Sequence, residues 1–169
     1  MGVDINTHIF RRMEDGSYKE LILYKSVGAD VGYMPLNWQL PYNNRDYALF
    51  DVLAGTGRGR AGIDEPIVPP RGAFPDAPQS EELDGEAQWN YGYTYFDWCE
   101  LKAFSESPKA EIVDWDEVDI YEDETYDTDK LPHRNVLKPW LQDLGFVLEC
   151  YGAYYPRPGE IIIQVSFNA

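Results

Sequence analysis

The stretch Val3-Asp4-Ile5-Asn6-Thr7-His8-Ile9-Phe10 alternates apolar and polar residues with period two, as a strand with one buried face does. Turn-forming residues follow in Glu14-Asp15-Gly16-Ser17, and an extended, aromatic segment resumes from Tyr18 to Tyr24. Because such a turn joins neighbouring antiparallel strands, we predict a β-hairpin over residues 3–25.

A second hairpin is predicted at the end of the chain. Its strands would be Phe146–Tyr155 and Glu160–Asn168, joined by the turn Pro156-Arg157-Pro158-Gly159. One face of the last strand would then carry Ile161, Ile163, Val165 and Phe167.

Short helices are predicted between these hairpins. Residues Arg45–Gly55 have a helical apolar spacing, with Asn44 available as the cap and Gly55 as the stop. Asn135–Leu144 is predicted as another helix that ends at Gly145, because Pro139 argues against a long one. Aromatic residues from Tyr91 onward predict a strand that runs into a helix near residues 97–102.

The connecting segments are rich in Gly and Pro. We expect an irregular connection over residues 28–44 and a long Gly/Pro loop over residues 56–88. The prediction is therefore one α+β domain over residues 1–169, with a mostly antiparallel sheet and two or three short helices.

Composition limits the class of protein. The chain has 169 residues, of which 44% are apolar and 15% aromatic, too many for a disordered acidic protein. It has no apolar run of membrane-spanning length and no basic segment followed by an apolar stretch at its start, so we expect a cytoplasmic protein. Cys99 and Cys150 stand alone and are expected to be buried thiols.

Charge is the strongest functional signal. Thirty acidic against fourteen basic residues give a net charge of -16, which disfavours direct binding of nucleic acid or anionic membranes and favours basic partners. Ten carboxylates and no Lys or Arg lie between Glu111 and Asp129, interleaved with aromatic residues. The partner-binding candidates in this acidic segment are Asp114, Trp115, Asp116, Glu117, Asp119, Tyr121, Glu122, Asp123 and Glu124.

Several islands of the sequence carry a resemblance. They are Met1-Gly2-Val3-Asp4-Ile5-Asn6, the stretch Arg45–Gly55 with Leu49-Phe50-x-x-Leu53-Ala54-Gly55, Pro70-Arg71-Gly72, and the terminal Val165-Ser166-Phe167-Asn168. The chain resembles a family of small, uncharacterised phage and prophage proteins that open Met-Gly-Cys-Asp-Ile-His. Asn6 and the Tyr91–Tyr95 stretch stand where that family has histidines. The resemblance implies a phage-encoded cytoplasmic protein and brings no established activity.

Polar residues of the first strand form the other candidate site. Asp4, Asn6 and His8 lie two residues apart, about 7 Å per step, so they are candidates for acid/base catalysis or for holding a divalent cation. A solvated strand face gives the same pattern, and we predict neither a defined metal site nor another cofactor.

Arginines gather in the Gly/Pro loop. Gly57-Arg58-Gly59-Arg60-Ala61-Gly62 matches the dinucleotide fingerprint in letters, but a helix precedes it where a strand is needed. Arg58, Arg60 and Arg71 are candidate ligands for an anion, and the alternative is that they pair with the protein's own carboxylates.

These observations favour a binding protein over an enzyme. The first hypothesis is a phage-encoded, anti-defence type of protein that inhibits a basic, nucleic-acid-handling host protein through residues 111–129, as a nucleic-acid mimic would. Alternatively, Asp4, Asn6 and His8 act with the loop arginines on an anionic, nucleotide-like ligand. A third hypothesis is a virion structural component.

Overall fold

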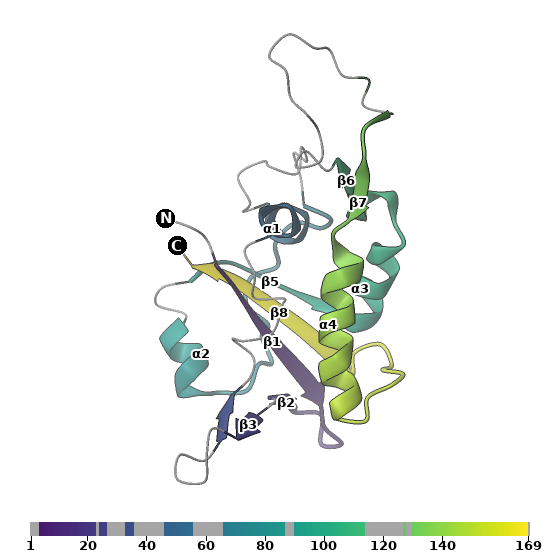
Figure 1. The fold of residues 1–169 in the computed structure, drawn as a ribbon. Helices are drawn as coiled ribbons and strands as arrows, with labels where there is room; N and C mark the ends of the chain where they lie inside the picture. The colour runs from purple at the N-terminus through teal and green to yellow at the C-terminus, as the bar shows by residue number, and fades with distance from the viewer. Residues whose placement is uncertain are drawn as a thin grey trace.

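A four-stranded antiparallel sheet forms the centre of the protein (Figure 1). The computed structural model describes residues 4–22, 24–26, 33–35, 46–55, 66–86, 90–113, 127 and 130–168. The sheet contains β1 (Asp4–Arg12), β2 (Tyr18–Glu20), β5 (Tyr91–Asp97) and β8 (Ile161–Asn168), in the order β2-β1-β8-β5. The strands from the two ends of the chain therefore pair at its middle.

The register of β1 on β8 separates the side chains into two faces. Ile5 pairs with Phe167 and Ile9 with Ile163, so these apolar side chains share one face of the sheet. All four are almost fully buried. This apolar face contains the main core, and the alternation read from the sequence is confirmed on both strands.

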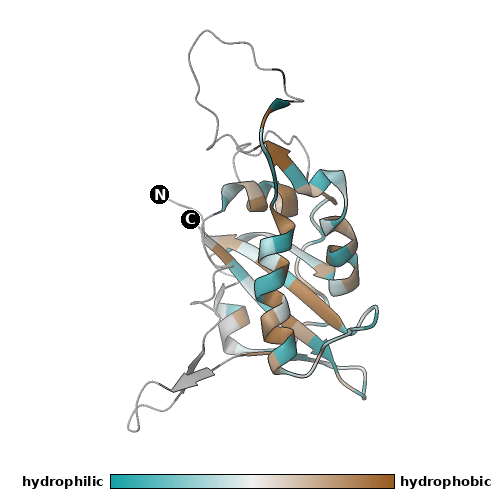
Figure 2. Cartoon of the chain, turned by 45° about the vertical axis from the view of Figure 1, so that its right-hand side comes forward, coloured by the Kyte–Doolittle hydropathy of each residue, from teal (hydrophilic) through white to brown (hydrophobic). Residues whose placement is uncertain are grey.

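Helices cover the apolar face. They are α1 (Tyr47–Ala54), α3 (Trp98–Ser105) and α4 (Leu137–Cys150), and Figure 2 shows hydrophobic residues concentrated in the strands that α4 crosses. The α1 residue Phe50 packs edge-on against Phe167 with 5.1 Å between ring centroids. Helix α1 ends at Gly55 as predicted, but its cap is Asp46 and not Asn44, because Asp46 Oδ1 accepts from the amides of residues 48 and 49.

Helix α4 corrects the prediction of a terminal hairpin. It runs through Gly145 to Cys150, so Phe146–Tyr155 is not a strand, and the partners of β8 are β1 and β5. Pro139 is tolerated because it lies in the first turn, where a backbone N–H has no intrahelical acceptor. The buried residues of this helix, Leu137, Trp140, Leu141, Leu144, Val147 and Leu148, follow helical spacing across the glycine.

A segment of the predicted Gly/Pro loop covers the opposite face of the sheet. This cover segment, residues 66–86, contains the short helix α2 (Glu81–Glu86), which the sequence did not predict. The Phe74 ring contacts one ring on each of three strands, with centroids 6.0 Å from Phe10, 4.9 Å from Tyr18 and 5.1 Å from Tyr95. The cover segment is therefore packed on the sheet through Phe74, whereas Ile67 and Val68 at its start pack against the main core. Residues 56–65 of the predicted loop lie outside the described part of the chain.

Two small antiparallel pairs complete the structure. One joins β3 (Tyr24–Ser26) to β4 (Tyr33–Pro35). The predicted second strand over residues 18–24 is therefore divided, because β2 ends at Glu20 and Tyr24 belongs to β3. Strand β4 lies within the expected irregular connection. The other joins β6 (Glu111–Val113) to β7 (His133–Asn135), next to a 3-10 helix at Pro108–Ala110. The predicted α+β class with a mostly antiparallel sheet is confirmed, and the helices are more numerous than expected. No helix of the described residues is long and apolar enough to cross a membrane.

Candidate functional site

The β6–β7 pair joins the two ends of the acidic segment. Glu111 lies opposite Asn135 and Val113 lies opposite His133, so the chain is held at one place immediately before residue 114 and immediately after residue 132. Figure 1 shows this pair at one end of the molecule, beyond α1 and α3.

Side-chain contacts fix the base of this segment to the helical layer. Ile112 is buried in the core, and Asn135 Nδ2 donates to the Ser105 carbonyl over 2.7 Å. The two terminal guanidinium nitrogens of Arg134, Nη1 and Nη2, donate to the carboxylate of Asp46 over 3.0 and 3.3 Å. Because Asp46 also caps α1, the pair is held on one helix terminus and on the end of α3.

Only two of the ten carboxylates belong to the described residues. Glu111 is exposed and forms no ion pair within that part of the chain, and Asp127 contacts Lys130 at 3.1 Å. The remaining carboxylates and the partner-binding candidates from Asp114 to Glu124 lie outside the described residues, so their role stays a prediction.

The polar side of β1 is covered and does not form a solvated face. His8 is 4% exposed, and its Nδ1 lies 2.6 Å from Glu20 Oε1 on the neighbouring strand. Asn6 is half-buried, and its Nδ2 has no hydrogen-bond partner among the described residues. Asp4 pairs with Asn168 through the backbone, and its side chain lies outside the described part.

Polar side chains of β8 continue this buried layer. The register places Gln164 opposite His8 and Ser166 opposite Asn6. Gln164 Oε1 accepts the Phe74 amide over 2.8 Å, and Ser166 Oγ accepts from Asn90 Nδ2 over 3.0 Å. The buried polar layer therefore joins the sheet to the cover segment through Gln164 and to the start of β5 through Ser166. Within the described residues no group of three His, Cys, Asp or Glu side chains is placed to hold a metal. His8 is therefore buried and Asn6 half-buried, and the catalytic hypothesis for Asp4, Asn6 and His8 stays a prediction.

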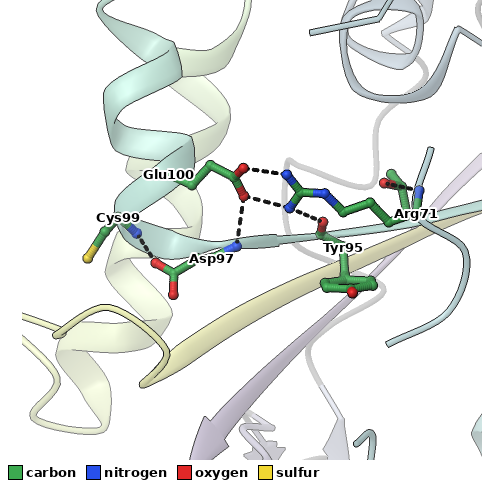
Figure 3. Close-up of polar contacts among 6 residues, drawn as sticks. Arg71, Tyr95, Asp97, Cys99 and Glu100 are labelled. Atoms are coloured by element: carbon green, nitrogen blue, oxygen red, sulfur yellow. Dashed lines mark hydrogen bonds and ion pairs between the residues drawn. The ribbon is translucent and has the colours of Figure 1, made fainter. Parts of the chain in front are cut away.

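Arg71 lies on the cover segment and binds α3 (Figure 3). Its guanidinium forms a two-pronged contact with the Glu100 carboxylate, with Nη1 2.7 Å from Oε2, and Nη1 also donates to the Tyr95 carbonyl over 3.2 Å. The hydrogen bonds to Glu100 raise the pKa of Arg71 above its ordinary value. The alternative that arginine pairs with the protein's own carboxylates is therefore observed for Arg71, whereas Arg58 and Arg60 lie outside the described residues.

The two thiols differ in environment. Cys150 is exposed, contrary to the expected burial. Cys99 is half-buried, and its Sγ donates to the Pro156 carbonyl over 3.3 Å. Burial raises the pKa of the Cys99 thiol above its ordinary value, and the negative charge of Asp97 is the second largest cause.

Comparison of the chain with protein-family models, with curated proteins and with solved structures found no match. Function therefore has to be argued from the residues and the geometry of the chain itself.

Non-local contacts are what the sequence reasoning missed. Glu100 for Arg71 and Asp46 for Arg134 are partners from distant segments, and Glu20 for His8 lies on the neighbouring strand of the β1–β2 hairpin. The Glu100 side chain had one local signal, since it stands three residues after Asp97 as the last member of a capping box. Asp46 has a comparable local signal as the N-cap of α1, and Glu20 has none.

Proposed function

We propose that the chain is an acidic interaction protein that binds and inhibits a basic, nucleic-acid-handling partner protein through its acidic segment, residues 111–129. The resemblance to phage and prophage proteins supports a phage-encoded protein acting in the host cytoplasm. The observation that carries the proposal is the combination of ten carboxylates without a base and the paired strands that bracket them.

The bracket supports binding because it restricts where the charge is presented. Both ends of residues 114–132 are held at the β6–β7 pair, and that pair is fixed to α1 and α3. A segment closed in this way has fewer arrangements to lose on binding than one with a free end. Its ten carboxylates supply much of the net charge of -16, and that charge steers a basic partner toward the protein.

Charge density sets a condition on nucleic-acid mimicry. Ten carboxylates over residues 111–129 give about one charge per 6 Å of fully extended chain and about one per 3 Å at the rise of a helix. One strand of DNA has a phosphate about every 3.4 Å. Mimicry of a strand therefore requires a compact bound form, whereas simple attraction of a basic surface does not.

Aromatic residues would provide the anchors of such an interface. Trp115 and Tyr121 alternate with the carboxylates, and binding energy at interfaces concentrates on Trp, Tyr and Arg. In the proposed complex the carboxylates set orientation and encounter rate, while the rings supply the buried contact.

The test is affinity capture from a bacterial lysate at about 50 mM and about 500 mM salt, because the higher salt screens charges beyond roughly 4 Å. We expect basic proteins to be captured at low salt and released by duplex DNA. The variant with Asp114→Asn, Asp116→Asn, Glu117→Gln and Asp119→Asn is expected to lose them.

A matched control removes four exposed carboxylates elsewhere. Glu14→Gln, Asp76→Asn, Asp84→Asn and Glu149→Gln change the net charge equally and lie at exposed positions without ion pairs to described residues. This control is expected to capture as the native chain does. Failure to capture any basic protein, or capture that survives both high salt and neutralisation of the acidic segment, would refute the proposal.

A further inference from the structure

Two turns meet at one end of the central sheet. The β1–β2 turn begins after Arg12, and the turn at residues 156–160 leads into β8. They are joined by the Arg12 amide, which donates to the Glu160 carbonyl over 2.8 Å, and by the Tyr18 hydroxyl, which donates to the Gly159 carbonyl over 2.8 Å. Figure 1 shows these turns at the opposite end of the molecule from β6 and β7.

A pocket of about 550 Å³ lies between the turns. Its lining includes three arginines, Arg11, Arg12 and Arg157, together with Glu14, Glu160 and Met13. These charges sum to one positive charge on a chain whose net charge is -16. Such a volume lies within the range of about 300–1,000 Å³ that small-molecule sites occupy.

The ion pairs within the pocket leave two guanidinium groups available. Arg11 contacts Glu160 Oε1 at 3.4 Å and donates to the Tyr151 carbonyl over 3.1 Å. The other oxygen of Glu160 accepts the Arg157 amide over 3.0 Å. Arg12 and Arg157 form no side-chain ion pair with any described residue. Of the two carboxylates that line the pocket, Glu160 is therefore already engaged, and exposed Glu14 forms no ion pair with a described residue.

Backbone contacts bring Arg12 toward the turn that carries Arg157. A Cβ placed on Gly159 would lie 3.8 Å from Arg12 Nη1, so this guanidinium packs beside the glycine. The Gly159 amide in turn donates to Asp97 at the start of α3. The turn is thus tied to β1, to β2 and to α3, and its position relative to Arg12 is fixed by the sheet.

We propose that the pocket of Arg11, Arg12 and Arg157 binds the phosphate or carboxylate group of a small anionic ligand. Guanidinium groups bind these anions through paired N–H donors, and Arg12 at the end of β1 and Arg157 on the turn before β8 line the same pocket. Met13, which is 42% exposed, provides an apolar contact for the rest of such a ligand. This site is separate from the acidic segment and does not depend on the function proposed for it.

The test is isothermal titration calorimetry of the full chain at constant ionic strength. The probes are inorganic phosphate, adenosine 5′-monophosphate and citrate, with adenosine as the uncharged comparison. Phosphate and the nucleotide report a phosphate site, and citrate reports a carboxylate site. The variants are Arg12→Gln, Arg157→Gln and both together, and the control is Lys19→Gln, an exposed charge on β2 outside the pocket.

We expect saturable binding of at least one anion by the native chain and by the Lys19→Gln control, and none of adenosine. The double variant is expected to raise the dissociation constant by about tenfold or more, equivalent to about 1.4 kcal/mol. Each single variant is expected to raise it by a smaller factor. Circular dichroism checks that the variants are folded. The proposal is overturned if no probe binds saturably, if the arginine variants change the affinity by less than about threefold, or if Lys19→Gln weakens it as much as they do.

Discussion

Substitution of Gly145 by Ala should stabilise the protein. Gly145 lies within α4 and has no positive φ, and a Cβ added to it would lie 3.9 Å from Trp98 Cη2, an ordinary van der Waals contact. Alanine at a helix interior is favoured over glycine by about 0.5–1 kcal/mol. In a domain of this size that gain corresponds to a rise in Tm of about 1–4 °C.

Gly152 is the matched control with the opposite sign. It follows the end of α4 with φ +71, and an added Cβ would meet no atom within 4 Å. Alanine there is expected to destabilise by about 1–2 kcal/mol through the left-handed backbone alone. Urea unfolding followed by circular dichroism measures both changes. If Gly145→Ala destabilised the protein by more than about 0.5 kcal/mol, the helix would end at Gly145 and the account of α4 would be refuted.

Three further predictions concern the covered face and the thiols. His8→Leu removes the partner of the half-buried Glu20 carboxylate and should cost about 1–3 kcal/mol; an unchanged urea midpoint would contradict this pairing. Phe74→Ala removes contacts to rings on three strands and should cost about 1–3 kcal/mol, with faster proteolysis of the cover segment; equal proteolysis would argue against the packing. At pH 8 a thiol reagent should modify Cys150 before Cys99, because Cys150 is exposed and the raised pKa of Cys99 lowers its thiolate fraction. The modification rate of Cys99 should rise further above about pH 9. Comparison of Cys99→Ser with Cys150→Ser tests this, and equal rates would contradict it.

Local patterns predicted the parts of the fold that local physics decides. The β1–β2 hairpin follows from period-two alternation and turn residues, and the α1 stop follows from Gly55. Strand β5 running into α3 was also predicted from the aromatic stretch. In each case the signal lies within a few residues of the element it determines.

The terminal hairpin was wrong because two periods compete in the same short stretch. Residues 146–148 read as an extended apolar run when taken alone, but Val147 and Leu148 continue the helical spacing of Leu141 and Leu144. Packing against the sheet selects the helix, even though Gly145 weakens it locally. Similarly, the cap of α1 is Asp46, whose carboxylate also binds Arg134 from a distant strand.

The candidate sites also differ in whether local sequence or contacts between segments determine them. A run of carboxylates can be recognised in the sequence because it depends on composition alone. The burial of His8 could not be predicted, since it depends on Glu20 and the cover segment meeting β1. The placement of Arg12 and Arg157 in the lining of one pocket likewise depends on the register of β1 against β8, which no local pattern specifies.

The most direct test of the central claim is the dissociation constant of a captured basic protein, measured at low and high salt for three chains. These are the native chain, the variant neutralised at Asp114, Asp116, Glu117 and Asp119, and the control neutralised at four exposed carboxylates elsewhere. We predict that the native chain and the control bind alike at low salt, that both weaken steeply with salt, and that the neutralised variant binds at least about tenfold more weakly, or about 1.4 kcal/mol. Equal affinity of the neutralised variant and the control at low salt would contradict the claim that the acidic segment is the binding surface.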